Sequence, residues 1–340
     1  MGVTSIEWTD RSINPVRARL GDATGHYCEK VSAGCTHCYA SGMQPRFGMP
    51  PFETQRRLDV EPFFDAARLN EVLRRKKPTR WFWCDMSDLF GPWVPDAWID
   101  QCFAVMALTP QHTHQILTKR PERMREYFGV HDGPVRLGDF IDDGTPDLRD
   151  RLDDASGAFG ACHANLEAPG RWPLPNVWLG TSVEDQATAN ARIPILLDTP
   201  AAVRFVSAEP LLGPVDFSPY LPVLTIGGVE LEQWLDLVIV GGESGPGARP
   251  CDVAWIRSVV AQCKLAAVPV FVKQLGACIA WPPAEGIRQG LINIKMYHLG
   301  QHPRRDEPFG YQLCDRKGGD PEEWPEDLRV REFPRESQGW

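Results

Sequence analysis

The sequence lacks the long apolar runs and leader patterns of membrane and secreted proteins. No run of eighteen apolar residues occurs in the 340 residues, so no transmembrane helix is expected. The N-terminal residues MGVTSIEWTDR do not place a basic stretch before an apolar core, so no secretory signal is predicted. We therefore expect a cytoplasmic protein, in which thiols stay reduced and clustered cysteines indicate metal binding or catalysis before disulfides.

Basic charge and a nucleotide-binding fingerprint are also lacking. The formal net charge of −9 argues against a broad phosphate-binding surface and leaves room only for a local basic groove. Gly241, Gly242, Gly245 and Gly247 lie close together, but their spacing does not match the dinucleotide fingerprint. No internal repeat or low-complexity tract stands out.

What the sequence does contain is a short loop rich in cysteine, residues 28–39, written CEKVSAGCTHCY and called the cysteine loop below. It holds Cys28, Cys35 and Cys38, with six residues in the first gap and two in the second. The small residues 32–34 allow such a loop to curl until its thiols converge. Three thiolates are too many for a disulfide and one short of a closed structural zinc site. They suit an iron–sulfur cluster that keeps one iron open.

The same thiols allow two other interpretations. A structural zinc site would take its fourth ligand from His26 or His37, although only one Cys-x-x-Cys pair is present. The thiols could also hold no metal. The remaining seven cysteines are scattered, and most are predicted to be small buried hydrophobic residues: Cys84, Cys102, Cys162, Cys251, Cys263, Cys278 and Cys314.

Short apolar runs alternate with helical patterns along most of the chain. One strand is expected within residues 6–14, before the cysteine loop, and helices within residues 61–78 and 95–110, from Pro121, after residue 185 and within residues 252–268. Six further strands are predicted to end at Cys84, Leu117, Leu179, Val206, Val240 and Lys273–Gln274. This alternation predicts an α/β fold, a partial or complete parallel β/α barrel, with a doubly wound open sheet as the alternative.

Each predicted strand turns polar where it ends, and in β/α barrels that end carries the active site. The cysteine loop is expected to leave its own strand at the same face. Three cationic side chains are expected at this face: Lys119, Arg120 and Lys273. Their positive charge would favour an anionic ligand; the alternative is that they form salt bridges to neighbouring glutamates. The strand-end residues of interest are Asp85, Ser87, Asp88, Lys119, Arg120, Glu184, Glu209, Gly241, Gly242, Glu243 and Lys273.

Two segments interrupt the alternation. Residues 129–172 are acidic and glycine-rich, which predicts a solvated surface insertion or, alternatively, a lid over the active site. Residues 281–340 are rich in Trp, Pro and charge and predict a C-terminal extension packed on the barrel. We therefore expect a barrel domain over residues 1–280 and the extension over residues 281–340.

The residues carry a resemblance to a known family. The blocks IEWTD, INPV, KVSAGCTHCYA, DMSDLF, QHTHQILTKRPERM, NVWLGTSVEDQ, AVRFVSAEPLLGPV and IVGGESGPGARP occur in the family's order over roughly residues 4–276. The family is the phage-protein family of unknown function named after gene products thirty-seven and sixty-eight, which is also widespread in bacteria. It in turn resembles radical S-adenosylmethionine (SAM) enzymes, which have a partial TIM-type barrel and a three-cysteine loop after the first strand.

The resemblance implies a [4Fe–4S] cluster held by Cys28, Cys35 and Cys38, with SAM on the open iron. An electron, supplied by a reducing partner such as flavodoxin or ferredoxin, would cleave SAM to methionine and a 5′-deoxyadenosyl radical that acts on an unknown substrate. It implies no particular catalytic residue. Cofactor-binding residues would be His37, Tyr39, Asp85, Ser87, Asp88, Glu209, Gly241, Gly242 and Glu243. Substrate-binding candidates would be Lys119, Arg120, Glu184 and Lys273.

The chain departs from the radical SAM pattern in two places and from the phage-protein family in one. The first cysteine gap is six residues where three is common in radical SAM enzymes, and His37 occupies a position that is commonly aromatic in them. Residues 17–27 resemble an insertion relative to the family's shorter link from NPV to the first cysteine. Two alternative classes therefore stay open: a non-catalytic zinc- or iron–sulfur-binding protein in phage or host nucleic-acid metabolism, and a barrel hydrolase or lyase that uses the carboxylates. The phage association also suggests a nucleic acid or nucleotide as the substrate.

Overall fold

The structure is a computed structural model that describes residues 4–55, 58–129, 173–222, 233–280, 295–297 and 310–334. Seven parallel strands form one sheet in the order β1-β5-β6-β7-β8-β9-β11. These strands are β1 Arg11–Ile13, β5 Arg80–Trp83, β6 Thr113–Thr118, β7 Val177–Ser182, β8 Val203–Ala208, β9 Leu237–Gly241 and β11 Val270–Gln274. Because β1 and β11 stand at the two ends of this order, the β/α barrel is partial, and the predicted fold class is confirmed.

All seven predicted strands are present, and the first is shorter than expected. β7 and β9 are buried along their whole length, which is typical of parallel strands covered on both faces. The segment predicted within residues 6–14 contributes only Arg11–Ile13 to the sheet. Ahead of it Trp8 is buried against Phe82, with ring centroids 4.7 Å apart. Trp8 therefore packs against Phe82 of β5 and does not lengthen the strand.

Helices follow the strands as the alternation predicted. They are α3 Leu69–Arg74, α4 Asp96–Leu108, α5 Pro121–Gly129, α9 Gln186–Leu197 and α10 Val253–Leu265. Helix α3 ends earlier than Pro78, since Arg75 is already extended with ψ of 122°. Residues 74–77 carry four consecutive positive charges, and the residue before a proline disfavours the helical conformation.

The chain divides into two compact units, which are described separately. The first comprises Met1–Val31, Ala40–Thr181 and Ile195–Arg204; the second comprises Ser32–Tyr39, Ser182–Pro194 and Phe205–Trp340. Cys28 therefore belongs to the first unit, and Cys35 and Cys38 belong to the second.

In the first unit, residues predicted to be an insertion form part of a small antiparallel sheet. Strands β2 Val16–Leu20 and β3 Ala23–Gly25 make a hairpin, and β4 Glu61–Phe64 pairs with β2 on the other side. Gly21, with φ of +56°, supplies the left-handed residue that the tight turn requires. Short helical segments follow the cysteine loop: α1 Tyr39–Met43, η2 Gln44–Phe47, α2 Phe52–Gln55 and, ahead of α3, η3 Ala66–Arg68.

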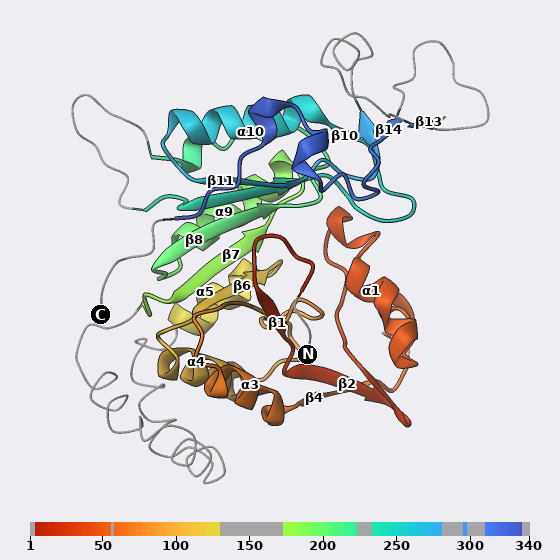
Figure 1. Ribbon diagram of the computed structural model, residues 1–340. Coiled ribbons are helices and arrows are strands. Elements are labelled where there is room, and N and C mark those ends of the chain that lie inside the picture. The colour runs from red at the N-terminus through yellow and green to blue at the C-terminus, as the bar shows by residue number, and fades with distance from the viewer. Residues whose placement is uncertain are drawn as a thin grey trace. The chain divides into compact units, whose positions relative to one another are not determined.

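In the second unit, α10 lies along β9 and β11, and the chain's last described residues cover the β11 edge (Figure 1). Val272 N donates to Val330 O at 2.8 Å, and Glu332 N donates to Val270 O at 3.0 Å, which adds an antiparallel segment beside β11. A second sheet has the order β10-β12-β14-β13. The remaining elements of this unit are η1 Ala33–Cys35, η4 Ser218–Tyr220, β10 Cys251–Asp252, β12 Ile279–Ala280, β13 Lys295–Tyr297, β14 Gly310–Gln312, η5 Pro321–Glu323 and η6 Glu326–Leu328.

The predicted insertion at residues 129–172 lies outside the described residues except for Gly129, so surface loop and lid both stay predictions. The domain boundaries at residues 280 and 281 stay predictions as well. Among the helices that the structure describes, none is long and apolar enough to cross a membrane.

Candidate functional site

Cys28 lies between two residues whose carbonyl groups are held by the ends of β5 and β6. Ser87, which follows β5, donates from its hydroxyl to Tyr27 O at 2.7 Å. Arg120, which follows β6, donates to Glu29 O at 3.1 Å. In the first unit, therefore, the start of the cysteine loop is anchored where parallel strands end, as the polar strand ends predicted.

Asp88 holds this anchor together and is itself buried. Its Oδ1 accepts from Thr118 Oγ1 at 2.7 Å, and its Oδ2 accepts from Arg120 Nη1 at 2.8 Å and from Lys119 N at 3.2 Å. Burial alone would lower the pKa of Arg120, but Asp88 and the Cys28 sulfur raise the pKa of its guanidinium. Arg120 also stacks over Trp93, 4.8 Å from the ring centroid. Asp88 therefore positions Arg120 and the residues that follow β6. These contacts account for a buried carboxylate at this place without any bound ligand.

A sharp turn follows β5 and presents the rest of the predicted polar cluster. Cys84 has φ of +58°, a left-handed conformation that is uncommon for a residue other than glycine. After this turn Asp85 accepts from Asn14 Nδ2 at 2.5 Å, and Asn14 Oδ1 accepts from Met86 N at 3.0 Å. Asp85 and Ser87 are half-buried. Of the predicted trio, these two stay the better placed to meet a ligand.

In the second unit the rest of the cysteine loop forms a tight double turn. Cys35 N donates to Ser32 O at 3.0 Å, and Cys38 N donates to Cys35 O at 3.4 Å. Cys35 is buried and Cys38 is half-buried, whereas Tyr39 is 50% exposed. A Cys-x-x-Cys pair on successive turns places two thiol-bearing residues on one short segment, which suits shared metal ligation.

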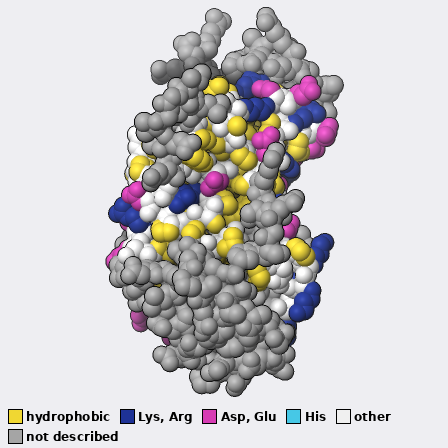
Figure 2. Space-filling model, turned by 90° about the vertical axis from the view of Figure 1, so that its left-hand side faces the viewer, with side chains coloured by type: hydrophobic (Ala, Val, Ile, Leu, Met, Phe, Trp, Pro, Cys, Tyr) yellow, Lys and Arg dark blue, Asp and Glu magenta, His cyan; other side chains and the backbone are white. Residues whose placement is uncertain are grey.

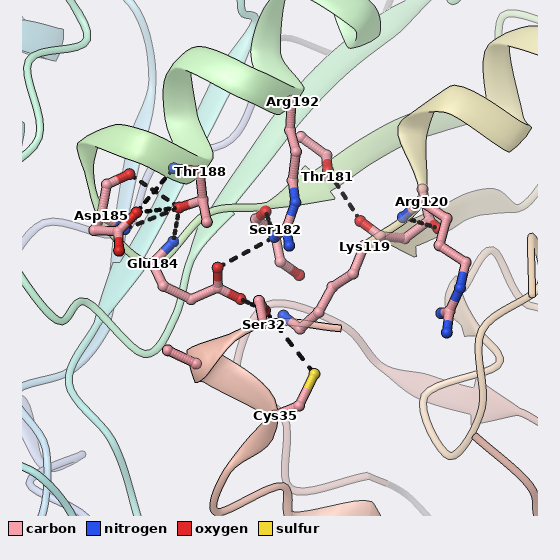
Figure 3. Close-up of polar contacts among 12 residues, drawn as sticks. Ser32, Cys35, Lys119, Arg120, Thr181, Ser182, Glu184, Asp185, Thr188 and Arg192 are labelled. Atoms are coloured by element: carbon pink, nitrogen blue, oxygen red, sulfur yellow. Dashed lines mark hydrogen bonds and ion pairs between the residues drawn. The ribbon is translucent and has the colours of Figure 1, made fainter. Parts of the chain in front are cut away.

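Glu184 holds this turn from the end of β7 (Figure 3). Ser32 Oγ donates to Glu184 Oε1 at 2.7 Å, and Arg192 donates to Glu184 Oε2 at 3.1 Å and to Ser182 O at 2.7 Å. The Glu184 side chain is 0% exposed. A side chain so enclosed contacts the cysteine loop, where we had expected it to meet a substrate.

Glu243 holds the same turn from the end of β9. His37 Nδ1 donates to Glu243 Oε2 at 3.0 Å, and Arg249 donates to both carboxylate oxygens, at 2.9 and 2.5 Å. Arg249 also donates to Ala33 O at 3.0 Å. Burial works to raise the pKa of Glu243, but the hydrogen bonds from Arg249 and His37 outweigh it and lower that pKa to about 2.

The two strand-end glycines approach protein backbone. A Cβ on Gly242 would lie against Leu275 O and 2.9 Å from Cys251 Cβ, and a Cβ on Gly241 would lie 3.0 Å from Gln274 O. Gly242 N donates to Gln274 O at 3.1 Å. Close packing beside β11 therefore accounts for both glycines, and a cofactor contact through them stays a prediction.

Lys273 and Glu209 form an ion pair with 3.0 Å between Nζ and Oε1. Ser207 Oγ donates to the other Glu209 oxygen at 2.9 Å. Among the described residues, no donor forms a hydrogen bond to Glu209 Oε1, so its contact with Lys273 is an ion pair alone. The salt bridge to a neighbouring glutamate given above as the alternative is therefore observed for Lys273, whereas Arg120 pairs with an aspartate, Asp88.

The two histidines proposed as zinc ligands differ in environment. His26 is buried against Phe47, with 5.4 Å between ring centroids, and its pKa is lowered to about 4 by burial and then by Arg17 and Arg68. His37 is exposed, and its Nδ1 bonds to Glu243. Such a bond leaves Nε2 of His37 as its metal-binding atom.

The side chains of the loop are of the type that iron–sulfur clusters bind, since their ligands are cysteine thiolates. The nine cysteines within the described ranges are all thiols and not disulfides, including Cys28, Cys35 and Cys38. Across those same ranges, no group of three or more His, Cys, Asp or Glu side chains is already drawn together as a metal site. Ligation by the three thiols stays a prediction.

Several residues that build the site were missed from the sequence. Arg192, Arg249, Asn14 and Trp93 were not singled out, and Ser32 was noted only as one of the small residues that let the loop curl. Arg249 lies in the block IVGGESGPGARP, so a search for cations close to each strand-end carboxylate would have found it.

On the face drawn in Figure 2, the described residues do not gather their positive charge into one field. Figure 2 shows one face, on which basic and acidic side chains are mixed among apolar ones in the described part. This agrees with the net charge of −9.

Comparison with known proteins gives a family but no curated relative, since no curated protein matches the chain. Among solved structures, one mutant of spore photoproduct lyase is 9% identical with a TM-score of 0.35, and the match covers 92% of this chain and 71% of that one. A second mutant is 10% identical with a TM-score of 0.31, over 85% and 66%. Nothing bears on the phage origin of the expected family, which stays a prediction. The chain belongs to the family described as "Protein of unknown function (DUF5131)", whose model matches residues 3–305.

Proposed function

We propose that the protein is a radical SAM-type iron–sulfur enzyme of the cytoplasm, whose substrate is a nucleic acid or a nucleotide. One observation carries the proposal: the cysteine loop is held on both sides of its thiols by residues that follow parallel strands. Ser87 and Arg120 hold the carbonyls beside Cys28 in the first unit. Glu184 and Glu243 hold the segment with Cys35 and Cys38 in the second.

The chain's own residues would bind, orient and shield. Cys28, Cys35 and Cys38 would hold a [4Fe–4S] cluster, which, when bound, supplies one electron from flavodoxin or ferredoxin to cleave SAM into methionine and a 5′-deoxyadenosyl radical. Asp85 and Ser87 are the strand-end groups best exposed to accept from the SAM amino group. Lys119, Arg120 and Lys273 are the cations proposed for an anionic substrate, and of these Arg120 pairs with Asp88 and Lys273 with Glu209.

The test is anaerobic reconstitution with iron and sulfide, followed by dithionite and SAM. We expect about four iron and four sulfide per chain and formation of 5′-deoxyadenosine. Changing Cys28, Cys35 or Cys38 to Ser should abolish both. Cys314→Ser is the matched control, because Cys314 lies outside the loop and is exposed. Unchanged iron content in the three loop variants would refute the proposal.

A second function, a non-catalytic zinc-binding protein, is favoured by one contact. The bond from His37 Nδ1 to Glu243 is the arrangement that orients a metal-binding histidine through its other nitrogen. Cys35 and Cys38 with His37 would then supply three ligands. One zinc per chain after aerobic purification, lost in His37→Gln and retained in His26→Gln, together with no SAM cleavage, would establish this alternative. The hydrolase or lyase alternative has less support, since Asp88, Glu184 and Glu243 are each paired with an arginine.

A further inference from the structure

Two carboxylates reach the cysteine loop, and neither has an oxygen left over. Glu184 accepts from Ser32 on one oxygen and from Arg192 on the other. Glu243 accepts from His37 and from Arg249. Their side chains are 0% and 5% exposed. Groups this enclosed can act on a ligand only through the loop that they contact.

From these contacts we infer that Glu184 and Glu243 are positioning residues that hold loop residues 32–38 in the shape needed for metal ligation. The inference rests on the proposed function and reassigns two residues expected to contact cofactor or substrate. It concerns what they do to Cys35, which lies between the held points Ser32 and His37, and to Cys38, which directly follows His37.

The fit of the loop against Glu184 supports this assignment. A Cβ on Gly34 would lie 2.7 Å from Glu184 Cγ, closer than real carbon contacts come. Only glycine therefore lets the loop backbone settle on this side chain. The Glu184 backbone N donates to Thr188 Oγ1 at 2.9 Å, which ties the backbone at Glu184 to the first turn of α9.

The ion pairs of Glu184 and Glu243 also limit the negative charge beside the cysteine thiols. A thiolate-ligated cluster carries negative charge, so bare carboxylates beside it would oppose its binding. Here each carboxylate comes with its own cation, Arg192 for Glu184 and Arg249 for Glu243. Each pair can hold the loop by hydrogen bonds while adding little net charge near the thiols.

Arg249 joins the second pair to the loop backbone. It donates to Ala33 O at 3.0 Å as well as to Glu243. The loop is thus held at Ser32, at Ala33 and at His37, on both sides of Cys35. Losing one of these bonds should loosen Cys35 without removing a metal ligand.

The first test uses the reduced, metal-free protein and measures the rate at which N-ethylmaleimide alkylates Cys35, by peptide mass spectrometry. Ser32→Ala keeps Glu184 paired with Arg192 and removes the loop's bond to Glu184, together with the 4.0 Å contact from Ser32 Oγ to Cys35 Sγ. Arg249→Gln leaves that sulfur contact in place and should also speed the reaction. We expect Cys35 to react about three- to tenfold faster, the range that corresponds to one lost hydrogen bond. Gly34→Ala should act in the same direction, and Ser32→Thr, which keeps a hydroxyl, should restore the native rate.

Two references make the result specific. Ser218→Ala is the matched control, since its hydroxyl bonds only within its own turn, to Asp216. The buried Cys251 serves as an internal standard in every sample. Native Cys35 rates in Ser32→Ala, Gly34→Ala and Arg249→Gln would overturn the inference.

The second test separates this inference from the proposed function. After reconstitution, the same variants should hold less iron, about half or below, and show an altered EPR spectrum of the reduced cluster. If the native chain takes up no iron while the alkylation rates change as expected, the proposed function fails and the positioning of the loop stands. If native and variant chains load equally with identical spectra and equal alkylation rates, the positioning is overturned and the function stands.

Discussion

At the scale of single residues, the buried chain of hydrogen bonds through His114 fixes one protonation state. Trp83 Nε1 donates to His114 Nδ1 at 3.0 Å, so the proton lies on Nε2, which is 3.0 Å from Thr109 Oγ1. Thr109 in turn donates to Val105 O at 2.7 Å. A second proton on His114 would point at the Trp83 N–H. Burial, followed by the neighbouring His112, accordingly lowers the pKa of His114 to about 3.

This arrangement predicts a loss of stability in acid. Because the pKa is lower in the folded state, the unfolded chain takes up the proton first, and the free energy of unfolding falls as the pH drops from 6.5 towards 3. The slope due to this group approaches about 1.4 kcal/mol per pH unit. Urea unfolding at pH 7, 5.5 and 4.5 should give a shallower decline for His114→Gln than for the native chain. Parallel declines in the two proteins would contradict the assignment.

Gly242 is a second residue with a testable packing reason. A side chain there would meet the Leu275 carbonyl and Cys251 Cβ, and backbone cannot move aside cheaply. Gly242→Ala should lower the free energy of unfolding by about 2–3 kcal/mol. Gly42→Ala is the matched control: Gly42 has open space around it in α1, so alanine should be neutral or add up to about 1 kcal/mol. Equal free energies of unfolding in the two variants would show that close packing is not the reason for a glycine at position 242.

At the scale of elements, the edge of β11 needs cover, because an exposed strand edge invites pairing with other chains. Residues 330–332 provide it by running antiparallel to β11, with the bridge at Phe271 and Arg331. The ring of Phe271 lies 5.1 Å from that of Phe333, and Arg331 stacks over it at 5.4 Å. Residues 330–332 therefore cover the backbone of β11 at this edge of the sheet.

Removing that segment should expose the β11 backbone. In a chain that stops after residue 326, amide exchange at Val272 should speed up about tenfold or more, because its N–H loses Val330 O. Aggregation should increase as well. A chain that stops after residue 334 keeps the pairing and serves as the control. Equal protection of Val272 in both truncated chains would show that the edge is covered by something else.

At the scale of the whole molecule, the seven strands and the polar ends that follow them were predictable, and the ion pairs within the site were not. Apolar runs ending in polar residues revealed the seven strands because parallel strands are buried on both faces. The sequence could not show that Glu184, Glu243 and Asp88 would be used up by Arg192, Arg249 and Arg120. These partners are 8, 6 and 32 residues away, and only the path of the folded chain brings them together.

The last prediction follows from binding of a metal by the folded chain alone. A ligand that binds the native state and not the unfolded state raises the melting temperature, and under the proposed function the three thiols bind metal only when the loop is folded. The reconstituted native protein should therefore melt about 5 °C or more above the same protein after chelator treatment. Cys314→Ser should show the same difference, and Cys35→Ser should show none. A native chain that melts at one temperature with and without chelator would mean that Cys28, Cys35 and Cys38 hold no metal in the folded protein.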